Sequence, residues 1–363
     1  SGIDEANYLN DYTQSQYGYL IQPNGDYTDP LTQKTSRITA YYTPDELDYF
    51  SNNSTDWLKE AWQSAVVTRH TLNISGGSDK ATFFAGASYV NQNANFDGIN
   101  TDKWTFRASS VIKLTQGLQL GLSLSGDLSN SKRFFYKQGS ESTENDFLTL
   151  LGNPEFVPYY VDGLPVLINS RTGNTESFHF FEAQKSDNFT NNRGTGLNVL
   201  GNLQYAVPFI KGLNAKVTFS KNLDNNFGKQ FGTFYDVYRF SMLGENKHIF
   251  GGDVLGTTRL RNGDRIRISP SYSDSYQFNG SLNYSRTFGK HSLSVLALYE
   301  QQESAFDSVD GMVEGIIIGG LPNQNYGTGV NTSTEVQTEF GRLAYAGRVN
   351  YSYADKYLLE LSV

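Results

Sequence analysis

Apolar and polar side chains alternate over stretches of about ten residues, and residues 103–131 show the pattern most clearly. On both sides of a short turn at 115–117, every second position is apolar: Trp104, Phe106, Ala108, Ile112, Leu114, Leu118, Leu120, Leu122, Leu124 and Leu128. A period of two places neighbouring side chains on opposite faces of a strand, so this hairpin has one apolar and one polar face. Strands of soluble sandwiches are usually about 5–6 residues long. Longer strand pairs with short turns at one end are typical of an outer-membrane β-barrel.

The same alternation predicts ten strands. Two of them form the hairpin within 103–131, and the other eight lie near residues 69–75, 81–90, 195–207, 213–222, 276–288, 293–299, 342–353 and 357–363. The connections fall into two classes: about three to five residues after each odd-numbered strand, and far longer after each even-numbered one. The predicted long loops are residues 91–102, 132–193, 225–275 and 303–341. Because short turns of such barrels face the periplasm, these loops and residues 1–68 are expected to be extracellular.

Composition and charge narrow the function. The chain has no cysteine, so it contains neither a disulfide framework nor a thiolate metal site. Its four histidines are scattered and no nucleophile–base arrangement stands out, so we expect no metal, no cofactor and no enzymatic activity. No run of about 18 apolar residues could form a membrane-spanning helix. The net charge of -8, without a basic stripe, argues against a nucleic-acid partner.

Several passages, taken in order, resemble SusC-like (SusC/RagA) TonB-dependent outer-membrane transporters of Bacteroidetes. The first is Thr55-Asp56-Trp57, and the second is HTLNISGG at residues 70–77, followed by a similar strand at 82–89. The third is TFGKHSL at 287–293, and the last is GRVNYSYADKYLLE at 347–360. The resemblance therefore extends over most of the chain from about residue 56 onward.

The resemblance implies an all-β fold, an antiparallel transmembrane barrel of 22 strands with a plug in its lumen. Residues 1–363 are then a single, partial β-barrel domain with about ten of those strands, and we expect the N-terminal plug and the remaining strands to be absent from it. The implied function is import of oligosaccharides, or of peptides, across the outer membrane of a Gram-negative cell. The implied partners are the lipid bilayer, a SusD-like surface lipoprotein and the TonB-ExbB-ExbD complex, which acts through the missing plug.

Two other function classes share part of the pattern. A passive outer-membrane porin or a surface adhesin would have the same barrel strands but would need no plug. A soluble carbohydrate-binding β-protein would also be rich in aromatic residues and glycine, but it would not explain the alternation of short and long connections. Recovery without detergent would indicate the soluble protein, and an upstream plug would separate a transporter from a porin.

Aromatic residues of the predicted outer loops are candidates for contact with cargo or with a surface lipoprotein. The candidates are Phe134, Phe135, Tyr136, Tyr159, Tyr160, Phe178 and Phe180, together with the neighbouring Phe156 and Phe181. Packing of the long loops on themselves is the alternative explanation for these rings.

The strands carry two further predicted sets of residues. Four basic side chains fall on the polar face and are expected to face the lumen: Arg107, Lys113, Arg342 and Arg348. Aromatic side chains near strand ends are expected to lie at the membrane interfaces as a girdle: Tyr89, Trp104, Tyr205, Phe288, Tyr353 and Tyr357.

Overall fold

The computed structural model describes residues 1–134, 143–168, 179–316 and 321–363, without the side chains of 143–146 and 261–263. Ten strands form one antiparallel sheet in the order β14-β13-β12-β11-β10-β9-β6-β5-β4-β3, so that nearly every strand pairs with its neighbours along the chain. The ten strands are β3 (Val67–Gly77), β4 (Ala81–Asn93), β5 (Asn100–Thr115), β6 (Leu118–Arg133), β9 (Phe189–Ala206), β10 (Leu213–Leu243), β11 (Ile249–Phe288), β12 (His291–Glu314), β13 (Asn331–Tyr353) and β14 (Tyr357–Ser362). The predicted all-β antiparallel fold and its ten strands are therefore confirmed.

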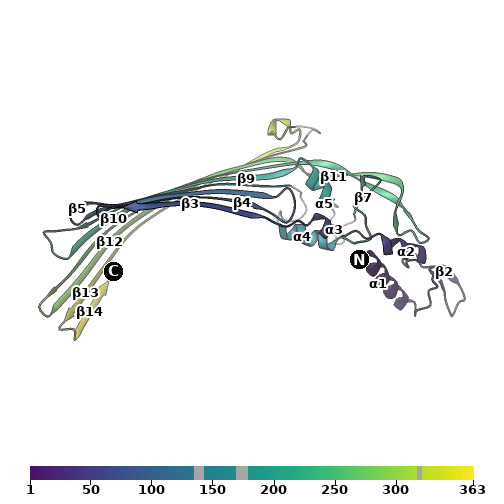
Figure 1. Ribbon diagram of the computed structural model, residues 1–363, viewed down its shortest axis with the longest axis horizontal. Coiled ribbons are helices and arrows are strands. Elements are labelled where there is room, and N and C mark those ends of the chain that lie inside the picture. Colours follow the sequence, from purple (N-terminus) through teal and green to yellow (C-terminus); the bar gives the residue numbers. More distant parts are fainter. Residues whose placement is uncertain (135–142, 169–178, 317–320) are drawn as a thin grey trace.

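The short turns meet at one end of the sheet, on the left of Figure 1, and the long connections meet at the other. The turn after β9 depends on Gly212, whose φ of +95° suits glycine. A Cβ atom there would lie 2.1 Å from the carbonyl oxygen of Ser285 on β11. The strand ends on this side, which we call the turn end, lie where the sequence predicts them.

The opposite end, which we call the loop end, corrects two predicted loops. Residues 225–275 are not a long loop, because β10 and β11 continue as a paired ladder until only residues 244–248 connect them. Most of 303–341 is likewise strand, and 315–330 is the connection between β12 and β13. The apolar alternation stops where both faces of a strand meet water or loops, but the backbone ladder continues because its hydrogen bonds do not depend on side chains. The predicted loop 91–102 shortens to 94–99 between β4 and β5, whereas 132–193 does contain a long connection, between β6 and β9.

Strand registers show which side chains share a face. Leu282 of β11 pairs with Ala215 of β10 and Ala297 of β12, whereas the next residue, Ser281, pairs with Lys216 and Leu298. Following the pairs across the sheet puts Leu122 and Leu282 on one face, which we call the outer face, and places Ser123 on the other, the inner face. The outer face is apolar over the half of the sheet nearest the turn end, as the sequence predicts.

Additional elements fill the loop end. The sheet arches, and α3, α4 and α5 lie beneath its concave side, while the connection that contains η1 lies above the convex side (Figure 1). Ile316 of that connection packs on Phe231 and Ile266, which the registers place on the outer face, so the outer face is the convex one. These elements are α1 (Gly2–Gln16), β1 (Asp26–Thr28), β2 (Thr35–Arg37), α2 (Pro44–Asn52), α3 (Trp57–Ala61), α4 (Thr143–Gly152), β7 (Tyr160–Val161), β8 (Leu164–Pro165), α5 (Phe180–Lys185) and η1 (Gln324–Tyr326).

The N-terminal segment is fastened to the tip of the β10–β11 hairpin by Glu46 of α2. This carboxylate is fully buried and accepts hydrogen bonds from the backbone N–H groups of Thr43, Asn246 and His248 at 3.0–3.1 Å. The His248 Nδ1 atom lies 2.7 Å from Glu46 Oε2, and the His248 ring stacks on Tyr42 at 3.9 Å. Because a buried carboxylate is costly unless its oxygens are hydrogen-bonded, this arrangement holds α2 against the hairpin tip. We call it the Glu46 clasp.

Candidate functional site

Beneath the loop end, buried side chains from five separate segments form what we call the loop cluster. Its members are Trp57, Ala61, Phe96, Phe134, Leu150, Phe180, Phe181 and Ala183. Trp57, the aromatic residue of the Thr-Asp-Trp passage, is 1% exposed and donates its indole N–H to the carbonyl of Val157 at 3.0 Å. Its ring stacks on Phe181 at 5.5 Å. The cluster therefore holds α3, α4, α5 and the start of the β6–β9 connection together on the concave side of the sheet.

His179 is the polar centre of the loop cluster. Its Nε2 lies 2.7 Å from the carbonyl oxygen of Tyr159, and its Nδ1 accepts the backbone N–H of Glu182 at 3.3 Å, which caps α5. The Tyr235 hydroxyl accepts the backbone N–H of His179 at 2.9 Å. Burial lowers the pKa of the His179 imidazole, and it raises the pKa of the Tyr235 hydroxyl. The neutral His179 therefore connects Tyr235 of β10, the loop at Tyr159 and the start of α5.

The predicted contact residues lie in and around the loop cluster. Phe134 and Phe180 are 3% and 0% exposed, and their rings meet edge to face at 5.4 Å. Tyr159 and Tyr160 are half-buried, with the Tyr159 hydroxyl donating to the Asp56 carbonyl and the Tyr160 hydroxyl to Glu182. Phe135, Tyr136 and Phe178 lie outside the described residues. Loop packing, the alternative explanation, accounts for the contacts that these four rings make, and contact with cargo or a partner stays a prediction.

Sequence reasoning did not identify an accessible aromatic pocket beside the loop cluster. Trp62 is 47% exposed, and its ring meets Phe147 at 6.1 Å. With Asp56, Leu58 and Lys59, these two residues line a hollow of about 390 Å³. The signal available in the sequence was Trp62 itself, a large aromatic residue in a polar segment shortly before the strand at 67–77. The pocket combines ring faces with one charge of each sign, a chemistry that suits sugar or peptide ligands.

The inner face carries a polar network along its length. Glu300 is paired with Arg342 and accepts a hydrogen bond from Gln277 at 3.2 Å, and Lys103 lies 3.5 Å from Asp127. Side-chain amides continue the network across neighbouring strands through Asn198, Asn222 and Ser275. This face can therefore stay hydrated while the outer face contacts apolar surroundings.

The four basic residues predicted to face the lumen all have inner-face registers. In the strand registers, Arg107 lies opposite Gly86 and Ser125, and Lys113 lies opposite Gln119. Arg342 lies opposite Gln302, and Arg348 lies opposite Leu296. All four basic side chains are exposed. Arg342 is the member whose ion pair is described above. Contact of these side chains with a plug stays a prediction.

The predicted girdle residues all have outer-face registers and fall into two rows. Tyr89 and Trp104 pair on neighbouring strands with ring centroids 4.7 Å apart, on the loop side of the apolar band. The others lie toward the turn end: Tyr205, Phe288, Tyr353 and Tyr357. Tyr299, whose place near a strand end also suggests the girdle, continues the upper row across β11–β13 together with Tyr276 and Tyr345, which sequence reasoning did not include. The rows flank the apolar band as interface residues would, and this role stays a prediction.

Two negative observations concern the described residues alone. Among them, no group of three or more His, Asp or Glu side chains is placed to hold a metal ion. No helix within the described ranges is long and apolar enough to cross a membrane.

Comparison with known proteins gives one curated relative and a set of solved structures. No protein-family model matches the chain. The TonB-dependent receptor P3 of Formosa agariphila is 24% identical over 319 residues, which cover 85% of this chain and 29% of that receptor. The RagAB peptide transporter matches with a TM-score of 0.60 and 20% identity, over 88% of this chain and 34% of that chain. The RagAB peptide importer in its open-open state matches with the same TM-score over 86% of this chain and 32% of that chain.

These matches confirm the resemblance to TonB-dependent transporters of the SusC/RagA type that the sequence passages predict. The structural matches show the shared fold, and the curated match extends the likeness to sequence over most of the chain. The chain spans about a third or less of the length of each protein. The matched proteins are named as a receptor, a transporter and an importer, in agreement with the prediction that this chain is not an enzyme.

Proposed function

We propose that this chain forms part of the wall and the extracellular loops of a TonB-dependent outer-membrane importer. The observation that carries the proposal is the sheet itself, whose outer face is apolar toward the turn end and whose inner face carries a polar network. A two-faced antiparallel sheet that is closed into a barrel presents apolar side chains to lipid and polar ones to water while its backbone groups stay paired. The position of the helices on the concave side supports loops that fold over the lumen (Figure 1).

The cargo we propose is an oligosaccharide or a peptide. Either one is too bulky to diffuse quickly through a narrow pore, so it must be captured outside and admitted when a plug moves. The outer membrane has no ATP, and the work therefore comes from TonB-ExbB-ExbD through the periplasm. Because the matched RagAB protein is described as a peptide transporter, a peptide cargo is as reasonable a proposal as a sugar. A SusD-like surface lipoprotein would cover the loop end.

Within this function, the Trp62 pocket and the half-buried Tyr159 and Tyr160 are the proposed points of contact with cargo or with the lipoprotein. Trp62 offers a large, partly exposed ring, and Asp56 and Lys59 line the same hollow. Aromatic side chains in partly enclosed pockets contribute strongly to binding because they bury much apolar area with little loss of side-chain freedom. The buried loop cluster supports these residues from behind.

The first experiment is to isolate the protein from its native outer membrane in detergent and to measure its intact mass and its co-purifying proteins. A polypeptide well above 40.5 kDa with a surface lipoprotein attached is the expected result. A chain of 40.5 kDa alone would contradict the proposal. Uptake by cells that continues after TonB is removed would instead favour a passive porin.

A pair of matched variants tests the contact site. Trp62→Ala should weaken binding of cargo or lipoprotein about tenfold, as expected for an aromatic residue at the centre of an interface. Trp104→Ala removes a ring of similar exposure, 51% against 47%, from the outer face and should leave binding unchanged. Equal effects of the two substitutions would show that the Trp62 pocket is not the contact site.

A further inference from the structure

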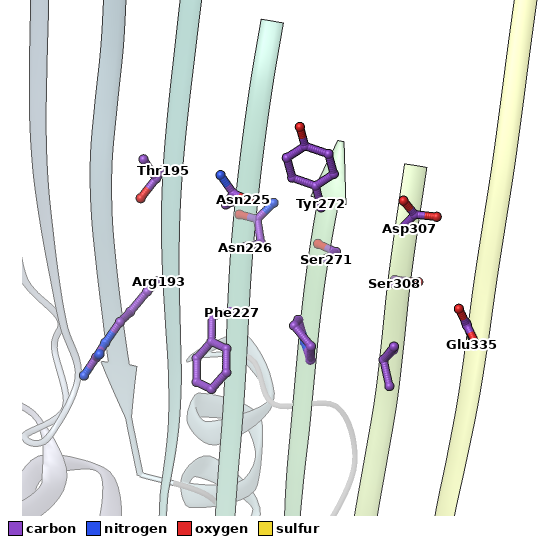
Figure 2. Close-up of a pocket in the computed structure, with 12 residues that line it drawn as sticks. Arg193, Thr195, Asn225, Asn226, Phe227, Ser271, Tyr272, Asp307, Ser308 and Glu335 are labelled. Carbon is purple, nitrogen blue, oxygen red and sulfur yellow. The ribbon is translucent and has the colours of Figure 1, made fainter. Parts of the chain in front are cut away.

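Above the apolar band, the outer face of the sheet contains a groove, lined by polar and apolar side chains together, that none of the roles described so far uses. It extends from β9 to β13 and has a volume of about 450 Å³. Figure 2 shows its labelled side chains on neighbouring strands, with Arg193 at one margin and Glu335 at the other. Its lining residues are Arg193, Thr195, Asn225, Asn226, Phe227, Pro270, Ser271, Tyr272, Asp307, Ser308, Val309 and Glu335.

The strand registers place this groove on the membrane-facing side of the sheet. Tyr272 and Leu282 are an even number of residues apart on β11, and the β10–β11 ladder has no register shift between them. The same holds for Asn225 and Val217 on β10. Because alternate strand residues share a face, the groove faces the same surroundings as the apolar band, but higher along the strands.

A row of hydrogen-bonded polar residues separates the groove from the apolar band. The Tyr299 hydroxyl donates to Gln301 at 2.9 Å, and the Gln301 amide donates to the Tyr276 hydroxyl at 2.9 Å. Further along β11, Asp274 accepts the Tyr272 hydroxyl at 3.0 Å and pairs with Lys221. At a rise of about 3.3 Å per residue, Tyr272 lies roughly 13 Å along the strand from Tyr276. The groove therefore lies where the polar heads of outer-leaflet lipids would be.

A second hollow lies below this row on the same strands and is lined by fewer polar side chains. It has a volume of about 400 Å³ and is lined mainly by apolar side chains, including Phe278, Leu282 and Tyr345. Gly280 forms its floor, since a Cβ atom there would meet only a Phe278 ring carbon at 3.9 Å. The apolar hollow fits an acyl chain, and the groove above it adds charged and amide side chains to exposed rings. The two hollows together match one amphiphilic molecule.

The chemistry of the groove fits a sugar chain. Phe227 and Tyr272 offer ring faces, and Asp307, Glu335 and Asn225 offer acceptors and donors for hydroxyl groups. Four interstrand spacings of about 4.8 Å give the groove a width of roughly 19 Å, enough for a short oligosaccharide. Arg193 at the β9 margin can bind an acidic substituent, because a guanidinium forms paired hydrogen bonds to phosphate or carboxylate.

We infer that this groove binds the oligosaccharide headgroup of an outer-leaflet glycolipid whose acyl chain occupies the apolar hollow below. The inference rests on the outer-membrane placement in the proposed function, but the site is separate from the path of the cargo. The outer face of the wall would then bind one class of lipid specifically, in addition to its general contact with the bilayer.

The test uses the full-length transporter in detergent and measures binding of lipopolysaccharide that carries core sugars by native mass spectrometry. Lipid A without core sugars and the free core oligosaccharide are the comparison ligands. Tyr272→Ala should weaken binding of the core-bearing lipid about tenfold, as expected when a stacked ring is lost. Tyr353→Ala is the matched control, since the two side chains are 39% and 38% exposed on the same face and Tyr353 lies at the turn end. Tyr272→Phe retains the ring and should bind nearly as well as the unchanged protein.

The outcomes separate the groove from the function. Binding of lipid A equal to that of the core-bearing lipid would overturn the inference, because the acyl chains or their phosphates would then account for it. Lipid binding by Tyr272→Ala equal to that of the unchanged protein would also overturn the inference, whether or not the oligomeric state of the variant changes. Either result, with energised uptake intact, leaves the import function standing. A protein that neither inserts into liposomes nor binds the lipid overturns both.

Discussion

The two ends of a single strand, β11, differ in what they require of their side chains. Toward the turn end, Phe278, Leu282 and Tyr284 alternate with Asn279, Ser281 and Asn283. Toward the loop end, Tyr272 and Asp274 stand on the outer face and serines on the inner face, so both faces carry polar groups. The β10–β11 ladder is regular over the first part, and its three register shifts all lie toward the loop end. Lipid enforces a strict alternation, whereas water and packed loops tolerate irregular pairing.

The largest expected effect concerns the loop end, where packing holds the structure together. Phe180→Ala should destabilise the loop cluster by about 3–5 kcal/mol, because it leaves a cavity beneath Phe96 and Phe134. Hydrogen exchange of α4 and α5 is the measurement, and the strands near the turn end should keep their protection. Phe209→Ala, at an 80% exposed position in the β9–β10 turn, is the control and should change little. Similar losses from both substitutions would remove the distinction between the two ends.

The next effect concerns the turn-end half of the sheet, which the proposed function places in lipid. Leu282→Arg or Leu122→Arg should cost roughly 2–4 kcal/mol for folding into liposomes, because a charge would face the middle of the bilayer. Ser123→Arg, on the inner face, should cost far less. Ala305→Arg lies on the outer face beyond the band, in register with Asp274 and Glu339, and should be nearly neutral. Equal costs at Leu282 and Ser123 would contradict the assigned faces.

A smaller effect is expected at the turns. Gly212→Ala should destabilise the sheet by about 2 kcal/mol, because the left-handed backbone and the Ser285 carbonyl both exclude a Cβ atom. Gly289→Ala, with φ of +58° and nothing within 4 Å, should cost only about 1 kcal/mol. Chemical denaturation of the protein in liposomes compares the two variants. A larger loss at Gly289 would show that close approach does not decide the cost.

The smallest effect is a pH dependence confined to the loop cluster. Burial holds the pKa of His179 below its ordinary value of 6.5, so the unfolded loop binds a proton more readily than the folded one. Stability should therefore be complete above about pH 6.5 and fall as the pH drops below it, by at most about 1.4 kcal/mol per pH unit. The ring centroids of Trp57 and His179 lie 5.2 Å apart. In a variant with Trp62 and Trp104 replaced by Phe, the fluorescence of Trp57 therefore reports on thermal unfolding of the loop cluster. His179→Gln cannot gain a proton and should flatten the dependence.

The comparison between the two ends also explains how far the sequence could predict the fold. The start of β10 at Leu213 and the end of β11 at Phe288 agree with the alternation, which continues up to the turns as the proposed lipid contact would require. The loop-side extensions of the same strands were assigned to a loop, since no alternation marks them. Their continuation depends on backbone pairing, which any side chain allows.

The candidate site was predictable only in part. The Thr-Asp-Trp passage drew attention to Trp57 through resemblance, yet its burial against Phe181 and Val157 depends on segments about a hundred residues away. Thr43 and Glu46 show the Thr-x-x-Glu pattern of a helix start, which indicates α2 but not its distant partners. The groove on the outer face depends on registers across five strands, so the sequence of any single strand does not reveal it.

The Glu46 clasp constrains the order in which the molecule can fold. Glu46 meets Asn246 and His248, which lie 200 and 202 residues further along the chain. The first helices made therefore cannot reach their final place until the β10–β11 hairpin exists, and contacts between such distant segments form slowly. Until then the Glu46 carboxylate lacks the N–H groups of Asn246 and His248, and burying it would be costly. We expect the clasp to be among the last contacts to form, because both the N-terminal segment and the hairpin tip must be in place before it can close.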